Sequence, residues 1–197
     1  MIAWKILTAT LLLWPGVVRA QGTAPTQPQG SRWWVGGGGG YLASRTDCTN
    51  CDSDQPYGSG GSVLFQGGLR VNERLLAGGE IFSAGRTIGD LDSRNTYLLA
   101  LVQFRPFATH GFFIKGGYGM AFVKTAFPLE GVQATARTWG MGVMYGAGWV
   151  FREGSRLSFA PVAAQYVTTA GDVQAIGGTA QNVVVNSWFV GAVVMVR

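Results

Sequence analysis

The chain is poor in charge, in histidine and in cysteine, and each shortage excludes a class of function. Charged residues make up 13% of the 197 residues, and there are one histidine and two cysteines. The lysines and arginines are scattered rather than clustered, so we expect no nucleic-acid partner. So few histidine and cysteine side chains do not supply a zinc ligand set. We therefore expect neither a metal nor a cofactor.

Long hydrophobic runs are also missing. After residue 20, no apolar stretch approaches the ~18 residues that a membrane-spanning helix requires. This excludes a helical membrane protein, although 47% of the residues are hydrophobic. That content is too high for a disordered chain. Two classes remain, a secreted β-domain and an outer-membrane β-barrel.

The first residues have the features of an export signal. Met1 to Lys5 is short and basic, Ile6 to Trp14 is apolar, and Val-Arg-Ala at 18–20 is a small-x-small cleavage site. We predict a signal peptide over 1–20, a disordered Pro-rich leader over 21–31, and one domain over 32–197.

The stretch from Thr138 to Phe151 alternates with a period of two residues, which is typical of a β-strand. One face is bulky and apolar, and the other is mostly glycine with almost nothing polar. Soluble sheets show polar groups to water on one face. Large apolar side chains facing lipid, and small ones facing a narrow interior, explain the pattern better. With Trp188 from the last strand, the predicted lipid-facing girdle is Trp139, Tyr145, Trp149, Phe151 and Trp188.

The spacing of the two tryptophans at 139 and 149 fits a bilayer. At ~3.3 Å per residue and a tilt of about 40°, they are roughly 25 Å apart along the membrane normal. This is about the height of the apolar band between the aromatic girdles of transmembrane barrels.

The same pattern recurs along the chain, with short and long connections in alternation. Short turns on one rim and longer loops on the other are typical of bacterial transmembrane barrels. We predict an all-β fold, an eight-stranded antiparallel up-and-down transmembrane β-barrel. Its predicted strands are 32–45, 61–71, 74–85, 95–105, 112–124, 138–151, 156–168 and 183–196, and its long outer loops are 46–60, 86–94, 125–137 and 169–182.

The segment from Tyr97 to Val123 resembles the central hairpin of the small OmpA/OmpX-like and opacity-type outer-membrane proteins. The resemblance extends over about 32–197 and rests on patterns rather than on signature motifs. It implies export to the outer membrane of a Gram-negative-type bacterium and contact with outer-membrane lipid. It also implies handling by the barrel-insertion machinery during biogenesis.

Several polar residues are predicted to face the barrel interior because their neighbours face lipid. Buried charges there must be paired. We therefore expect Glu80 to form a salt-bridged plug with Arg70, Arg105 or Lys115, and the alternative is a gated or ion-selective pore. The predicted interior polar network is Gln66, Arg70, Glu80, Gln103, Arg105 and Lys115.

The histidine and the two cysteines are the remaining candidates for a chemical role. His110 falls in a predicted periplasmic turn with no His-x-Ser pattern, so we expect no catalytic role and no enzyme. Cys48 and Cys51 lie in a polar loop of a protein that crosses an oxidising compartment, which favours a disulfide that stiffens the first loop.

The function that these patterns favour is a non-enzymatic envelope protein that presents four extracellular loops for structural or interaction roles. An extracellular partner would then bind through those loops. The alternatives are a narrow porin-like transport channel and a secreted lipocalin-like barrel that binds its ligand inside.

Overall fold

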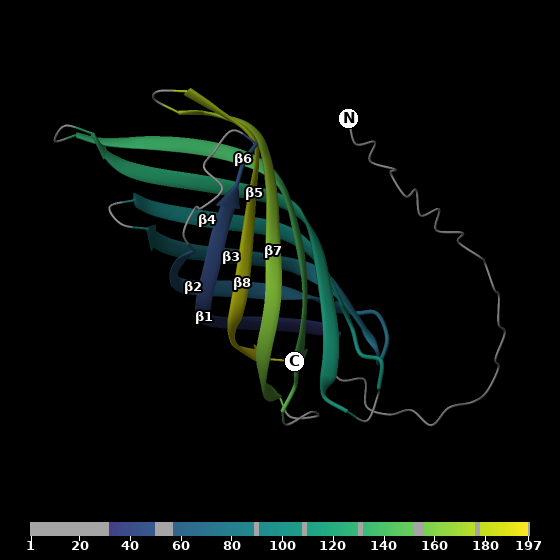
Figure 1. Ribbon diagram of the computed structural model, residues 1–197. Helices are drawn as coiled ribbons and strands as arrows, with labels where there is room; N and C mark the ends of the chain where they lie inside the picture. The colour runs from purple at the N-terminus through teal and green to yellow at the C-terminus, as the bar shows by residue number, and fades with distance from the viewer. Residues whose placement is uncertain are drawn as a thin grey trace, which may run out of the picture.

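The computed structural model describes residues 32–49, 57–88, 91–107, 110–129, 132–151, 156–175 and 178–196. The predicted signal peptide and leader lie outside these ranges. Nowhere in them does a helix offer the length and hydropathy that a bilayer crossing requires. The eight strands in Figure 1 are β1 (Trp33–Asp47), β2 (Gly58–Arg70), β3 (Leu75–Ile88), β4 (Leu91–Phe104), β5 (Phe112–Leu129), β6 (Val132–Trp149), β7 (Leu157–Ala175) and β8 (Gly178–Val196).

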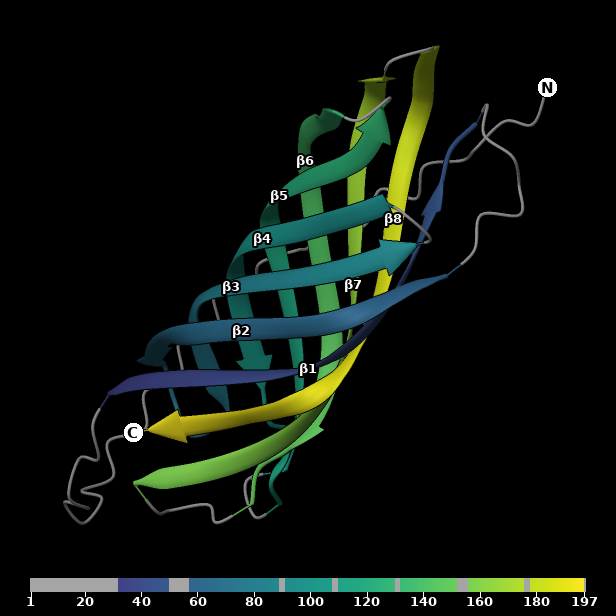
Figure 2. The same ribbon diagram turned by 90° about the vertical axis from the view of Figure 1, so that its left-hand side faces the viewer.

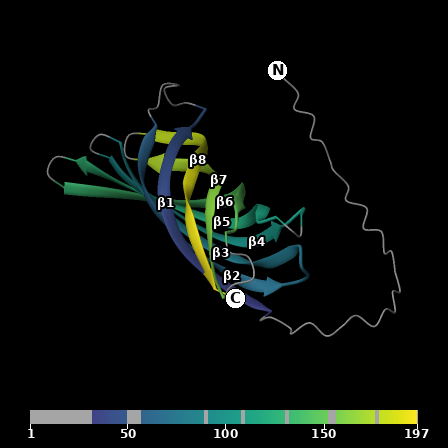
Figure 3. The same cartoon turned by 90° about the horizontal axis from the view of Figure 1, so that it is seen from below.

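The strands form one closed barrel. Each strand pairs antiparallel with its neighbours in the chain, and β1 also pairs with β8. Figure 2 shows β1 running beside β8, and Figure 3 shows the same two strands side by side from below. The predicted eight-stranded antiparallel up-and-down barrel is confirmed.

The register determines how steeply the strands tilt. Ala43 on β1 pairs with Trp188 on β8, and the row of directly paired residues continues strand by strand from β8 to β2. From β2 the row returns to β1 at Trp33 instead of Ala43. The stagger is therefore ten residues (43 − 33 = 10). With ~3.3 Å per residue and ~4.8 Å between strands, the tilt is about 41°. An eight-stranded barrel at this tilt has an interior that side chains fill.

Side chains alternate between the inside and the outside of the barrel. On β6, Met144 is 1% exposed, whereas Trp139 and Tyr145 on the opposite face are 64% and 53% exposed. The buried side chains form one hydrophobic core along the barrel axis. Its larger members are Trp34, Leu42, Leu64, Phe82, Tyr97, Leu99, Leu101, Phe113, Met144, Tyr166, Phe189 and Met195.

Glycines at the seam between β1 and β8 let the two backbones approach closely. A Cβ atom on Gly38 would lie 2.0 Å from the carbonyl oxygen of Ala192, and one on Gly40 would lie 2.3 Å from that of Val190. Neither contact is sterically allowed, so a side chain at either position would push the strands apart. The glycine run of β1 is therefore part of the closure of the barrel.

The strands at the outer rim are longer than predicted. Three predicted loops, 86–94, 125–137 and 169–182, are wrong as loops, because β3 runs to Ile88, β4 starts at Leu91, and the strands of the β5–β6 and β7–β8 hairpins occupy most of the other two segments (Figure 1). These segments contain many polar residues, which in the sequence alone favour a loop. Beyond the lipid, however, a hairpin needs no apolar face, and backbone pairing alone continues the ladder.

The seam glycine gives a direct test of closure. We expect Gly38→Val to lower the folded fraction strongly, because its Cβ atom must displace the backbone of β8. Gly79→Val is the matched control, since the nearest atom to a Cβ there is the carbonyl oxygen of Leu99 at 3.5 Å. The folded fraction is read from heat-modifiable gel mobility after refolding in detergent. Equal refolding of both variants would contradict a tight β1–β8 seam.

Candidate functional site

The centre of the barrel contains a buried ion pair. Lys115 on β5 donates a hydrogen bond from Nζ to Oε2 of Glu80 on β3 over 2.6 Å. The hydroxyl of Tyr166 on β7 donates to the other oxygen, Oε1, also over 2.6 Å. The side chains of Glu80 and Lys115 are 0% and 1% exposed. Both carboxylate oxygens thus have a strong donor, which a buried carboxylate requires.

The register explains how side chains from three separate strands meet. Glu80 and Lys115 face inward from β3 and β5, with β4 between them. The residue opposite Lys115 on β6 is Gly146, and the next inward position on β5 is Gly117. The ion pair therefore joins two strands that are not hydrogen-bonded to each other.

A layer of aromatic rings packs beside the ion pair. Phe82 stacks on Tyr166 with ring centroids 4.0 Å apart and contacts Phe189 edge-on at 5.4 Å. Tyr97 lies 5.1 Å from Tyr166 and accepts a hydrogen bond on its hydroxyl from Thr168. All four rings are fully buried. The rings and the ion pair together fill the cross-section of the barrel.

The structure brings most of the predicted interior polar residues inside. Gln66, Glu80, Gln103, Arg105 and Lys115 are buried, whereas Arg70 at the end of β2 is only half-buried. Of the three cations predicted as partners of Glu80, Lys115 forms the ion pair with it in the described part of the chain.

Both glutamines of this set have side-chain atoms without a hydrogen-bond partner among the described residues. The side-chain oxygen of Gln66 and both amide atoms of Gln103 lack a hydrogen-bond partner among the described residues. Gln66 lies directly opposite Glu80, and Gln103 lies directly opposite Lys115. Spare donors and acceptors therefore lie beside the ion pair.

Two inward residues were missed by the sequence analysis. Tyr166 lies in the predicted seventh strand, but the sequence does not show that its hydroxyl meets Glu80. Arg86 was assigned to a loop, although it continues the period of two from Glu80. Its guanidinium is buried near the outer rim and donates to Ser44 over 2.9 Å and to Thr46 over 2.6 Å.

Solved structures with this architecture are membrane barrels. Ail, the attachment invasion locus protein of Yersinia pestis, matches with a TM-score of 0.60 and 16% identity, over 84% of this chain and 99% of Ail. Neisserial surface protein A matches with a TM-score of 0.56 and 15% identity, over 85% of this chain and 97% of that protein. The protein has the fold of the small eight-stranded outer-membrane barrels. No family model matches the sequence, and no curated protein matches it.

In outer-membrane barrels the outward apolar face is the lipid-facing surface, bounded by aromatic rows. Here Trp149 and Phe151 lie near one end of that face and Trp139 lies toward the other, whereas Trp188 lies in the same row of directly paired residues as Tyr145. All four are 41–64% exposed. Tyr145 also faces outward but lies between these two ends, six residues from Trp139.

A polar chain crosses this outward face. The hydroxyl of Tyr145 donates to the side-chain oxygen of Gln165 on β7, whose amide nitrogen donates to Asn186 on β8 over 3.3 Å. Each amide therefore has a partner on the outer surface, as polar groups next to hydrocarbon require. The sequence analysis did not find this chain, because it depends on which residues lie opposite one another.

Three exposed cations form a row at the outer rim. Lys124 on β5 lies directly opposite Arg94 on β4 and Arg137 on β6. Among the described residues, no carboxylate forms an ion pair with any of the three. Like charges placed opposite each other destabilise a sheet. The row lies two residues beyond Phe122 and Trp139, roughly 5 Å further out along the barrel axis.

The remaining predicted sites are peripheral. His110 lies in the turn between β4 and β5, at the end of the barrel opposite the long hairpins, with its ring 5.9 Å from that of Phe107. Cys48 follows β1, but Cys51 lies outside the described residues. The disulfide between them stays a prediction.

Removing one member of the central ion pair should destabilise the barrel. Lys115→Met leaves the Glu80 carboxylate buried without its cation, which costs about 3–5 kcal/mol. The double variant Glu80→Leu/Lys115→Met should recover much of that loss, since no buried charge remains. The measurement is the urea midpoint of unfolding in lipid vesicles, with the exposed Lys124→Met as control. A Lys115→Met midpoint equal to that of the control would show that the pair is not stabilising.

Proposed function

We propose that the protein is a non-enzymatic, structural β-barrel that is embedded in the bacterial outer membrane and presents its outer hairpins to the extracellular space. The observation that carries this proposal is the combination of an apolar outward band with an interior that is filled by side chains. The apolar outward band requires a hydrocarbon environment. The filled interior supports a role in stabilising the barrel wall.

The outward band supports lipid over water. Large hydrophobic side chains on all eight strands face outward, among them Trp33, Phe65, Ile81, Leu98 and Tyr118, each more than half exposed. Soluble proteins rarely expose continuous apolar surface on this scale. A secreted lipocalin-like barrel would carry polar side chains on this face, so the outward band argues against that alternative.

The interior supports a structural role over transport. Phe82, Tyr97, Tyr166 and Phe189 are 0% exposed and lie next to the Glu80–Lys115 pair. A solute would have to displace these rings and separate a buried ion pair. The same contacts occupy Glu80, the buried carboxylate of the described interior, so this group is not available as a base or nucleophile.

The outer rim offers two surfaces for partners. The row formed by Arg94, Lys124 and Arg137 lies just beyond the apolar band, where the phosphate groups of outer-leaflet lipid would neutralise it. Above it, the β5–β6 and β7–β8 hairpins extend away from the barrel (Figures 1 and 2). An extracellular partner would bind these hairpins, since the wall below them is enclosed by lipid.

Location and orientation can be tested with epitope tags. A tag inserted between residues 130 and 131 should be labelled by antibody on intact cells, whereas a tag after Glu73 should be labelled only after the outer membrane is permeabilised. Both tagged proteins should co-sediment with the outer membrane. Recovery in the soluble secreted fraction, or surface labelling of the tag after Glu73, would refute the proposal.

A channel is the second candidate function, and planar-bilayer recording separates it from the first. We expect the inserted wild-type barrel to give no discrete conductance steps. A variant with the plug removed, Glu80→Ala/Lys115→Ala/Tyr166→Ala, shows whether the measurement would detect an opening. Discrete steps from the wild-type protein would favour the channel.

A further inference from the structure

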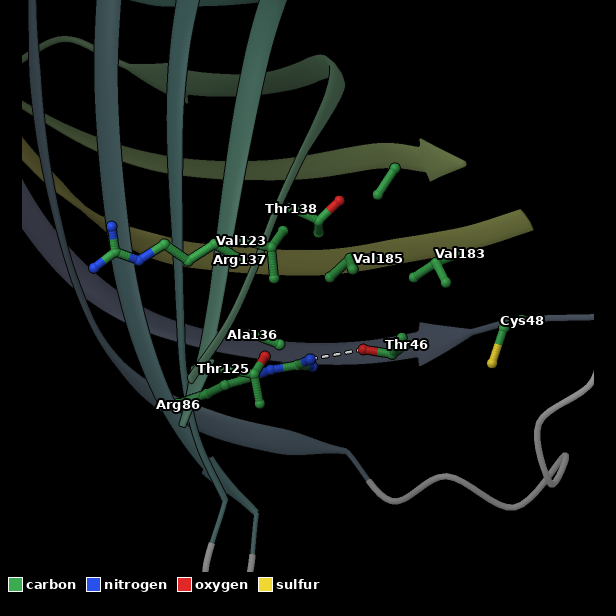
Figure 4. A pocket seen from close by; sticks show the side chains of 11 residues that line it. Thr46, Cys48, Arg86, Val123, Thr125, Ala136, Arg137, Thr138, Val183 and Val185 are labelled. Atoms are coloured by element: carbon green, nitrogen blue, oxygen red, sulfur yellow. Dashed lines mark hydrogen bonds between the residues drawn. The ribbon is translucent and has the colours of Figure 1, made fainter. Parts of the chain in front are cut away.

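A small cavity lies inside the outer mouth of the barrel, between the wall and the bases of the two long hairpins. It has a volume of about 180 Å³. Side chains from β1, β3, β5, β6, β7 and β8 contribute to its lining, and Figure 4 shows those that surround it. The residues that matter for its chemistry are Thr46, Arg86, Val123, Ala136, Val183 and Val185.

One side of the cavity carries a buried cation for which the described residues supply no counter-charge. Arg86 is 8% exposed, and its hydrogen-bond acceptors are the neutral hydroxyl groups of Ser44 and Thr46. Its Nε atom has no partner, and no carboxylate among the described residues pairs with the guanidinium. Figure 4 shows its side chain extended toward Thr46, whereas Arg137 points away. A buried charge without a partner is costly, so an anion beside Arg86 would be strongly favoured.

The other walls are mostly apolar, with Cys48, Thr125, Arg137 and Thr138 also in the lining. Val123, Ala136, Val183 and Val185 line the cavity from β5, β6 and β8. An apolar cavity of about 150 Å³ accommodates a molecule the size of benzene, so this one has room for about seven non-hydrogen atoms, which is enough for a seven-carbon alkyl chain whose polar head lies on the Arg86 side. That size suits a single short hydrocarbon chain and is too small for a sugar phosphate that carries several acyl chains.

The pairing between β6 and β7 ends beside the cavity. The ladder between β6 and β7 ends at Met141 and Thr169, although β6 begins at Val132 and β7 continues to Ala175. Ala136 on β6 and Ala170 on β7 line the cavity on either side of this separation. Figure 1 shows the two hairpins diverging there.

We propose that the outer mouth binds a medium-chain monocarboxylate, with its carboxylate against the Arg86 guanidinium and its alkyl chain against the valines. Guanidinium groups match the planar geometry of carboxylates and are always charged. The chain contributes by burying apolar surface. This binding site is independent of the proposed structural role and does not require transport.

The test uses octanoate and the full barrel in nanodiscs of neutral phosphatidylcholine. Equilibrium dialysis against radiolabelled octanoate, with empty nanodiscs subtracted, should show saturable binding of one octanoate per barrel. Arg86→Gln should weaken it by about tenfold or more, because a charge-assisted hydrogen bond is lost. Arg94→Gln removes an exposed arginine from the outward face and should leave the affinity unchanged. Octanol, which keeps the chain and lacks the charge, should bind no better to the wild type than to Arg86→Gln.

A second variant keeps the proposal testable if Arg86→Gln does not fold, as judged by heat-modifiable mobility. Ala136→Phe retains the arginine and fills the cavity, so it should abolish octanoate binding. Nanodiscs that contain phosphatidylglycerol should not compete, which would show that the site takes the free carboxylate rather than an anionic lipid. The proposal is overturned by octanoate binding no greater than that of empty nanodiscs, by equal affinity in Ala136→Phe, or by equal affinity in a folded Arg86→Gln.

Discussion

Pairing between β1 and β8, from Val35 to Asp47, is the constraint on which the rest of the structure depends. In hydrocarbon no water is present to satisfy an unpaired backbone group, and each one costs several kcal/mol. A sheet that crosses lipid must therefore close on itself. Closure of eight strands with a stagger of ten residues sets the tilt, and the tilt sets the width of the interior. The glycines of β1 belong to this requirement, because larger side chains would hold the two edges apart.

The narrow interior explains the chemistry inside the barrel. Glu80, Lys115 and Tyr166 come from three strands and satisfy one another completely at the carboxylate. Such a pair adds little stability over a well-packed apolar core, yet it penalises any arrangement that separates its members. Because a one-residue slip reverses the direction of every side chain on a strand, an incorrect register would turn Glu80 or Lys115 toward lipid. The ion pair thus favours one register of β3 against β5.

The sequence predicted the fold because alternation of bulky and small residues, as from Thr138 to Phe151, is a local property that needs no knowledge of partners. It also placed Glu80 and Lys115 inside. It did not predict which cation Glu80 would meet, since that depends on the stagger of the strands. Arg86 and the outer ends of β5 to β8 were missed because segments with many polar residues were interpreted as loops. The contact between Tyr145 and Gln165 was missed because it joins residues that are opposite in space and 20 positions apart in sequence.

The seam between the first and last strands also affects how quickly the barrel can form. Gly40 lies opposite Gly191, which is 151 positions further along the chain (191 − 40 = 151). Contacts so distant in sequence form slowly, because the freedom of all the intervening chain must be lost before the contact is gained. Tyr166 lies on the penultimate strand, so the hydrogen bonds of Glu80 are completed only as the wall around it is completed. Assembly is therefore cooperative. A partly formed barrel lacks both the β1–β8 pairing and the hydrogen bond from Tyr166 to Glu80.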